Sequence, residues 1–206
     1  MNEDKSWITW FLTKHPIGKY FIRVEMEYIK DQFNLFGFPK KVPNYKKVLE
    51  YIKGDYIPPE NRIRYDLDEN IDDLGIRLYG LIHSRFIMEK AGLEKLKKKY
   101  ENNDYDRCPN VNCNRQCLPI GLSESLGEGC LYMYCPFCGD VYHAENQICS
   151  QIDGSAFGSS YIMKFLKQYP EVQQSYEPDR LPPKPQLRLF GFKIEDPKPS
   201  DPKWNK

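Results

Sequence analysis

The chain has 206 residues, enough for one medium-sized domain or for one domain with a smaller satellite. Hydrophobic residues make up 40% and charged residues 29%, which is typical of a globular protein and argues against wholesale disorder. Thirty basic residues stand against 29 acidic ones, and this net charge of +1 provides no global basic field for nucleic acid. No apolar run approaches the roughly 18 residues that span a bilayer, and the N-terminus lacks the features of a secretory signal. We therefore expect an intracellular protein without a membrane partner.

Charge, cysteine and proline content divide the chain into three parts. Residues 104–160 carry 2 basic and 7 acidic residues and contain all seven cysteines. Eight of the 16 prolines lie in the last 46 residues. We therefore predict a helical first domain over residues 1–103, a compact cysteine-rich domain over residues 104–160, and a C-terminal part over residues 161–206 that contains a helix and a proline-rich extended tail.

The early segments of the first domain have the spacing of short helices. Helices of one to two turns are predicted over residues 7–12 and 27–33, and another over residues 45–53, which ends before Pro58 and Pro59. Prolines and scattered charges over residues 54–69 predict a long loop.

The strongest helical pattern follows this loop. Asn70 is expected to cap the helix, and Gly92 to end it in a left-handed conformation. A second, shorter helix is predicted over residues 93–100. The apolar face of the main helix is formed by Ile71, Leu74, Leu78, Leu81 and Ile82.

The cysteine spacing predicts a metal site. Two residues separate Cys135 from Cys138, and four separate Cys108 from Cys113. Two cysteines that are separated by two residues on a tight turn can bind one ion, and the backbone N–H groups of the turn donate hydrogen bonds to their sulfurs. Four thiolates leave no open coordination position, so we predict one structural zinc ion per chain held by these four residues.

Two other ligand choices are compatible with the spacing. Cys117 follows Cys113 closely enough to form an arm with it, and His143 could replace one thiolate. Cys130 and Cys149 have no close partner, and a lone cysteine is commonly a small buried hydrophobic residue. We expect His143 to lie on a strand surface, and His83 to be a satisfied histidine of the main helix.

The composition of the cysteine-rich domain favours protein association over nucleic-acid binding. Its net charge of −5 becomes more negative with four thiolates and one Zn²⁺, whereas phosphate binding relies on positive charge. Many zinc ribbons bind nucleic acid, so a zinc-ribbon nucleic-acid or transcription adaptor is the alternative hypothesis, although this charge disfavours it. The apolar residues around the cysteines exceed what so small a module can bury, which predicts an association surface. Motifs of nucleotide-binding, zinc-protease and serine-hydrolase sites are missing from the sequence, so we expect no catalytic activity.

Several segments of the chain form a recognisable set. They are SWITWF at residues 6–11, EYIKDQFNLFGF at 27–38, VPNYKKVL at 42–49, YGLIHSRFI at 79–87, LPIGLS at 118–123, DVY at 140–142, DGSAFG at 153–158, YPE at 169–171 and LRLFGFKI at 187–194. With these segments, the sequence resembles the family of casein kinase II regulatory beta subunits over about residues 5–195. LIHSR and the order of the cysteine arms around LPIGLS are specific to this family as a set.

The resemblance implies an α+β fold, with an all-helical N-terminal domain, a small β-rich zinc domain and an extended C-terminal tail. It also implies a non-catalytic subunit that dimerises through the zinc domain, stabilises two casein kinase II catalytic subunits in a heterotetramer and modulates the choice of protein substrates. Its ligand set maps onto Cys108, Cys113, Cys135 and Cys138. No direct nucleic-acid partner is expected, and the expected location is the cytoplasm and nucleus.

Two contact surfaces follow from the resemblance and from residue chemistry. Pro109, Val111, Leu122 and Val141 are apolar neighbours of the cysteines and are predicted at an isologous dimer interface. Tail residues Arg188, Phe190 and Phe192 are predicted to dock on the catalytic subunit. In an extended strand, alternate residues share a face, so both rings are expected to project together. Gly191 between them would also permit a sharp bend or a close backbone approach.

The sequence also departs from the family pattern. The family usually has a strongly acidic loop in the first domain, whereas residues 53–69 carry 5 acidic and 3 basic residues. The N-terminal serine cluster of the family is reduced to Ser6.

Overall fold

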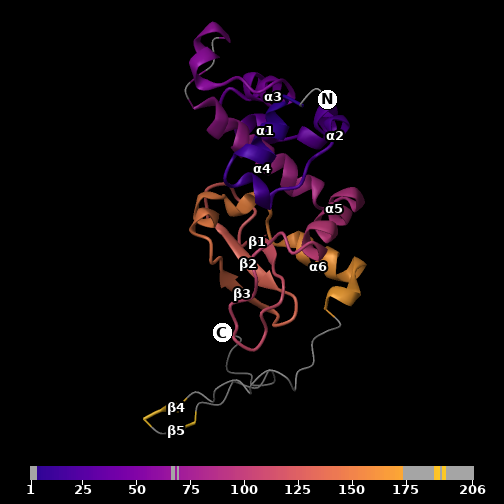
Figure 1. Cartoon of the computed structure of the whole chain (residues 1–206), viewed down its shortest axis with the longest axis vertical. Helices are drawn as coiled ribbons and strands as arrows, with labels where there is room; N and C mark the ends of the chain where they lie inside the picture. Colours follow the sequence, from indigo (N-terminus) through magenta and orange to yellow (C-terminus); the bar gives the residue numbers. More distant parts are fainter. Residues whose placement is uncertain (1–3, 66–67, 69, 174–187, 191, 194–206) are drawn as a thin grey trace, which may run out of the picture. The chain divides into compact units, whose positions relative to one another are not determined.

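The computed structural model describes residues 4–65, 68, 70–173, 188–190 and 192–193. The chain forms two compact units, Met1–Tyr176 and Glu177–Lys206. The first unit contains helices and a small antiparallel sheet, which confirms the predicted α+β class (Figure 1). Its helices are α1 (Trp7–Lys14), α2 (Met26–Lys30), α3 (Tyr45–Lys53), α4 (Ile71–Phe86), α5 (Lys90–Glu101) and α6 (Ser160–Gln168). Its short 3-10 turns are η1 (Gly18–Tyr20), η2 (Gln32–Leu35), η3 (Phe38–Lys40), η4 (Pro59–Tyr65), η5 (Gln147–Gln151), η6 (Gly154–Ala156) and η7 (Pro170–Val172).

An aromatic cluster joins α1 to the long helix α4. Ser6 caps α1, because its side chain accepts a hydrogen bond from the Thr9 N–H. Trp7 and Phe11 are fully buried, and their rings stack with centroids 5.3 Å apart. The Phe11 ring also meets the ring of Tyr79 from α4, edge to face at 5.3 Å. These contacts place the core of the helical part between α1 and α4.

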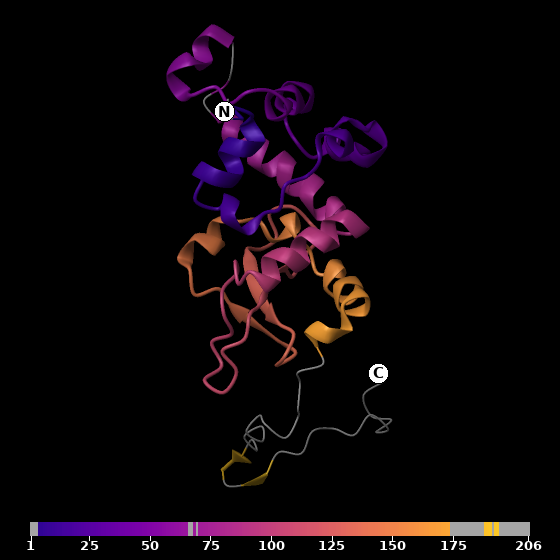
Figure 2. The same ribbon diagram turned by 45° about the vertical axis from the view of Figure 1, so that its right-hand side comes forward.

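Helix α4 connects the helical part to the sheet region within the same unit. Figures 1 and 2 show it leading from the N-terminal helices towards η6 and the three-stranded sheet. On α4, His83 is completely buried; its Nδ1 lies 2.7 Å from the Ala156 carbonyl oxygen, and its Nε2 accepts from the Ile22 N–H at 3.2 Å. Both ring nitrogens are therefore satisfied by the neutral tautomer, as expected for this histidine.

His83 should make the stability of the protein depend on pH. Burial lowers its pKa from 6.5 to about 4, because the charged ring would lose its hydration and oppose the Ile22 N–H. Between these two values the unfolded chain binds more protons than the folded one, so stability falls as the pH falls. We expect His83→Gln to remove up to about 1.4 kcal/mol per pH unit of this dependence. Urea denaturation across this range tests it; equal slopes for both proteins would contradict it.

Several predicted helix boundaries are wrong. The main helix ends at Phe86, and Gly92 lies inside α5, where a Cβ would meet the Phe86 carbonyl oxygen at 2.0 Å. Gly92 therefore permits close packing of two helices and does not end one. The Asn70 side chain makes no capping hydrogen bond to the described residues. The predicted helix over residues 27–33 is divided into α2 and η2 at Asp31.

The predicted loop over residues 54–69 contains the 3-10 turn η4. Within it, Arg62 is buried and forms an ion pair with Asp72 of α4. Asp72 also accepts a hydrogen bond from the Tyr51 hydroxyl at 2.8 Å. These contacts attach η4 to α3 and α4.

The sheet of the first unit has the order β1-β2-β3 and is antiparallel throughout. Its strands are β1 (Leu118–Gly121), β2 (Leu131–Cys135) and β3 (Asp140–His143). Alternate residues of β2 are buried, as expected for a strand that covers a core with one face. At the end of β1, a Cβ on Gly121 would meet the Gly154 carbonyl oxygen at 1.9 Å, so glycine allows η6 to approach the sheet closely. None of the helices in the described part of the chain has both the length and the hydrophobicity of a transmembrane span.

Candidate metal centre and partner surfaces

Two loops present the four predicted metal ligands. Cys108 and Cys113 precede β1, and the Cys113 N–H donates to the Asn110 carbonyl oxygen at 2.9 Å. Cys135 ends β2, and Cys138 lies in the turn before β3. Gly139 closes this turn with a φ of 71° and donates its N–H to the Cys135 carbonyl oxygen at 2.9 Å.

The four sulfur atoms have the spacing of a tetrahedral metal site. All four Sγ atoms lie within 4.8 Å of one another. The Cys108–Cys138 and Cys113–Cys135 sulfur separations are 3.7 and 3.6 Å. Four sulfurs about 2.3 Å from a central ion would lie roughly 3.8 Å apart, so the cluster could hold a metal ion without rearrangement.

Hydrogen-bond donors approach two of these sulfurs. The Cys138 N–H lies 3.4 Å from the Cys135 Sγ, as predicted for a knuckle turn. The side-chain amide of Asn110 donates to the Cys138 Sγ at 3.8 Å. Such donors orient thiolates and stabilise their negative charge in a metal complex.

The protein environment alone disfavours thiolates at this site. Burial raises the pKa of Cys113 to about 11. A hydrogen bond with Cys117, together with burial, raises the pKa of Cys135 to about 12. A positive ion would reverse this preference, because a coordinated thiol loses its proton.

The remaining cysteines and His143 lie outside the four-sulfur cluster of the described residues. Cys117 and Cys149 are buried, as expected for structural cysteines, and Cys130 is half-buried. His143 lies on β3, as expected, with its ring 5.0 Å from the ring of Tyr132. The geometry therefore favours the first of the ligand choices that the spacing allowed.

The residues predicted at a dimer interface are all exposed in the single chain. Val111 is 93% and Leu122 60% exposed, Val141 of β3 is 40% exposed, and Pro109 is also exposed. Val111 lies in the loop between two of the clustered cysteines. Exposed apolar side chains beside a rigid cluster have the chemistry of an association surface.

The predicted docking segment of the second unit is a hairpin. Strands β4 (Arg188–Leu189) and β5 (Phe192–Lys193) pair antiparallel, with Leu189 opposite Phe192. The two rings therefore do not project from one extended strand, and of the two conformations that the sequence allowed the structure has the bend: the chain reverses at Phe190, which has a φ of 49°. A two-residue hairpin connection requires such left-handed backbone. Phe190 is 92% and Phe192 79% exposed, and Arg188 is exposed. Gly191 and the prolines at residues 178–185 lie outside the described residues.

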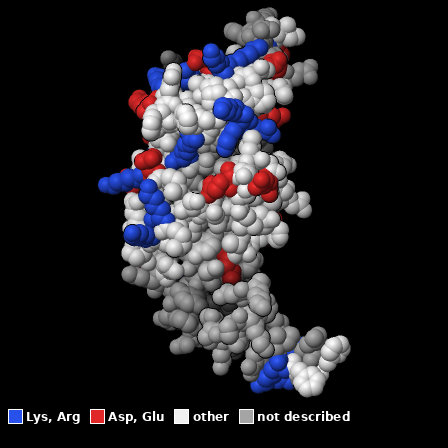
Figure 3. Space-filling model, turned by 180° about the vertical axis from the view of Figure 1, so that it is seen from behind, with Lys and Arg blue, Asp and Glu red and all other residues white. Residues whose placement is uncertain are grey.

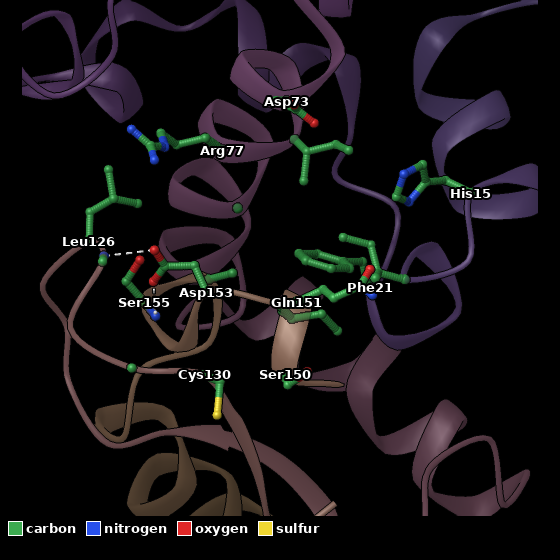
Figure 4. Close-up of a pocket in the computed structure, with 17 residues that line it drawn as sticks. His15, Phe21, Asp73, Arg77, Leu126, Cys130, Ser150, Gln151, Asp153 and Ser155 are labelled. Atoms are coloured by element: carbon green, nitrogen blue, oxygen red, sulfur yellow. Dashed lines mark hydrogen bonds between the residues drawn. The ribbon is translucent and has the colours of Figure 1, made fainter. Parts of the chain in front are cut away.

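A polar cavity of about 560 Å³ lies between α4 and the loops around η5 and η6 (Figure 4). Asp153 forms part of its wall and accepts hydrogen bonds from the N–H groups of Gly127 and Ser155 at 2.7 and 3.0 Å. Arg77 and Asp73 extend from α4, and Cys130 lies on the opposite wall. The sequence did not predict this cavity, because its walls come from segments far apart in the chain.

The charge distribution of the first unit agrees with the sequence. On the face shown in Figure 3, the Lys and Arg side chains gather over the helical part. Residues 104–160 contribute two arginines, Arg107 and Arg115. The guanidinium of Arg115 stacks on the Phe137 ring at 4.8 Å, and that of Arg107 donates to the Asn114 carbonyl oxygen at 3.1 Å. Two arginines against seven acidic residues do not provide the positive charge that a broad phosphate-binding surface needs.

Comparison with known proteins places these features in a family. The family model for the casein kinase II regulatory subunit matches residues 6–193. The chain is 38% identical over 191 residues to casein kinase II subunit beta' of Saccharomyces cerevisiae, covering 91% of this chain and 72% of the relative. It is 37% identical over 194 residues to casein kinase II subunit beta' of Drosophila melanogaster, covering 94% and 85%.

A third relative supports the same assignment. Casein kinase II subunit beta of Schizosaccharomyces pombe is 35% identical over 194 residues, covering 94% of this chain and 80% of the relative. The matched region includes all four clustered cysteines and both strands of the tail hairpin. The chain therefore belongs to the casein kinase II regulatory subunit family, a family of regulatory and not catalytic subunits.

Proposed function

We infer that this chain is the regulatory subunit of a casein kinase II holoenzyme, in which it forms a homodimer, binds and stabilises two catalytic subunits, and modulates the choice of protein substrates. The observation that carries this proposal is the extent of the family match. It runs from residue 6 to residue 193 and so includes the metal cluster, the exposed apolar residues beside it and the aromatic hairpin. By the same family argument, we propose that it works in the cytoplasm and nucleus.

The ion proposed for the four-cysteine cluster is zinc, one per chain. Four thiolates in a tetrahedral arrangement suit Zn²⁺, which has no redox chemistry and no directional preference of its own. A closed site of this kind is structural and leaves no position for a substrate. Its role would be to hold the loop of Val111 against the turn before β3.

The homodimer is proposed to form through Pro109, Val111, Leu122 and Val141. In a twofold interface one patch meets its own copy, so a single set of apolar side chains serves both chains. The strong exposure of Val111 and Leu122 supports this assignment, because burial of these side chains in the dimer would stabilise it.

Val111→Asp should convert the dimer to monomers. An unpaired carboxylate in a desolvated interface is costly, and twofold symmetry introduces it twice, so we expect dimerisation to weaken at least about a hundredfold. Ile63→Asp is the matched control, because Ile63 is 91% exposed on η4. Sedimentation equilibrium of both variants tests the assignment, and a Val111→Asp protein that remains dimeric would overturn it.

The hairpin is proposed to dock on the catalytic subunit, with Phe190 and Phe192 as apolar anchors and Arg188 as a polar contact at the rim. Aromatic side chains that are exposed in the free chain are typical interface anchors. Co-expression with a casein kinase II catalytic subunit, followed by affinity purification, tests the proposed function. We expect the two chains to purify together, and a catalytic subunit that purifies without this chain would contradict the proposal.

A further inference from the structure

Two exposed phenylalanine rings lie on the helical part of the first unit. Phe33 is 86% exposed within η2, and Phe36, directly after η2, is 81% exposed. A single exposed apolar residue on a protein surface is common, but two such rings on one short turn form a patch. Neither ring belongs to the residues assigned above to the dimer or to the hairpin.

The turn that carries these rings is firmly attached. The Asp31 side chain accepts a hydrogen bond from the Phe33 N–H at 2.9 Å. The Asn34 side-chain amide donates to the Tyr28 carbonyl oxygen at 3.1 Å, and the Arg85 guanidinium from α4 donates to the Asn34 carbonyl oxygen at 2.8 Å. The backbone that carries the rings is therefore already ordered, so this turn would lose little conformational entropy when a partner binds.

Two hollows flank Phe36. One has a volume of about 420 Å³ and includes Tyr28, Phe33 and Met88 in its wall. The other has a volume of about 770 Å³ and is lined by Leu35, Pro39, Tyr45 and Leu49 among others. Phe36 lines both hollows, so the two hollows adjoin at this residue. We call Phe33, Phe36 and these two hollows the Phe36 surface.

Lysines give the Phe36 surface a positive rim. Residues 37–47 contain four lysines and no acidic residue. Lys40 and Lys46 line the larger hollow and are exposed, and neither forms an ion pair with another described residue. The acidic residue in that hollow, Glu50, is already paired with the Lys53 Nζ at 2.6 Å. The larger hollow therefore combines apolar walls with the positive charges of Lys40 and Lys46.

We propose that the Phe36 surface binds a segment of another protein that is acidic and carries aromatic or aliphatic anchors. The anchors fill the hollows on either side of the Phe36 ring, and the carboxylates meet Lys40 and Lys46. Charge complementarity of this kind sets the choice of partner, while the apolar anchors supply most of the binding energy.

Other occupants fit the charges and the shape less well. A second copy of the chain would place lysines against lysines. The chain's own C-terminal unit, residues 177–206, carries seven basic and five acidic residues and has the same sign of charge as the surface. An anionic membrane would leave the hollows empty. Glu89 lines the smaller hollow, so the carboxylates of the segment are placed at the larger one, beside Lys40 and Lys46.

The probe is a display library of short random peptides selected against the full chain, with the recovered peptide measured by fluorescence anisotropy. We expect recovered peptides to be acidic with aromatic or aliphatic residues. Phe36→Ala should weaken binding about tenfold or more, and Lys46→Glu should weaken it in a salt-dependent way. Met163→Ala and Lys167→Glu are matched controls, because both side chains are exposed on α6.

Circular dichroism melting shows whether each variant is folded, and Lys46→Glu, a surface charge change, keeps the test valid if Phe36→Ala unfolds. Recovery of no peptide, recovery of basic peptides, or binding that is the same in Phe36→Ala and Lys46→Glu as in the unmodified chain would overturn the proposal. Binding to phosphatidylserine vesicles that depends on Phe36, without peptide binding, would assign the surface to membranes instead. Co-purification with the catalytic subunit is an independent result and does not affect this test.

Discussion

Cys135→Ser is expected to abolish zinc binding and dimerisation together and to unfold the sheet region. The serine hydroxyl is a poor ligand for zinc, and three thiolates no longer close the tetrahedron. Structural zinc sites have apparent binding free energies of roughly 10–16 kcal/mol at neutral pH. This binding free energy is as large as the whole free energy of unfolding of a typical domain, about 5–15 kcal/mol, so loss of the ion should unfold the sheet region. Elemental analysis, sedimentation and circular dichroism of the variant measure the three effects.

Cys130→Ser is the matched control for this prediction. Cys130 precedes β2 and lies outside the four-sulfur cluster of the described residues. The Cys130→Ser protein should therefore keep one zinc ion per chain and remain dimeric. A stable dimer of Cys135→Ser, or zinc loss that is equal in both variants, would contradict the assignment of the ligands.

Phe190→Ala and Phe192→Ala should each weaken binding to the catalytic subunit by roughly thirtyfold, or about 2 kcal/mol. Each ring is almost fully exposed in the free chain and would lose its hydration on docking. The Phe190 substitution isolates the ring, because alanine and phenylalanine meet the same backbone strain at a φ of 49°. Titration calorimetry against the catalytic subunit gives both affinities.

Lys193→Ala tests whether the loss comes from the rings or from the hairpin. Lys193 lies opposite Arg188 in the hairpin register, and its exposed side chain is not among the proposed anchors. We expect it to change affinity little and all three variants to keep zinc and remain dimeric. Unchanged affinity in both phenylalanine variants would mean that the hairpin is not the docking element.

Local signals in the sequence predicted the metal cluster well. Two residues separate Cys135 from Cys138, and four separate Cys108 from Cys113. Gly139 closes the turn of the first of these pairs. Most of the geometry of the metal site is therefore set by residues that are close together in the sequence. Helix α3 was also predicted with its observed bounds, from a short helical segment that ends before Pro58 and Pro59. In both cases the information lies in neighbouring residues.

Features that depend on distant contacts were missed. Gly92 has the sequence signature of a helix end, but its function is to let α5 approach the Phe86 carbonyl oxygen. Gly191 allowed a bend in the tail, but the sequence did not predict that Phe190 would adopt the left-handed conformation, because phenylalanine rarely does so. The exposure of Phe33 and Phe36 cannot be predicted from their type, because periodicity assigns such rings to the core.

Native mass spectrometry of the chain mixed with a casein kinase II catalytic subunit tests the central claim most directly, because one mass reports subunit stoichiometry and bound zinc together. We predict a complex with two copies of each subunit and one zinc ion for each copy of this chain. A complex with a single copy of this chain, a zinc-free dimer, or no complex with the catalytic subunit would contradict the proposed function.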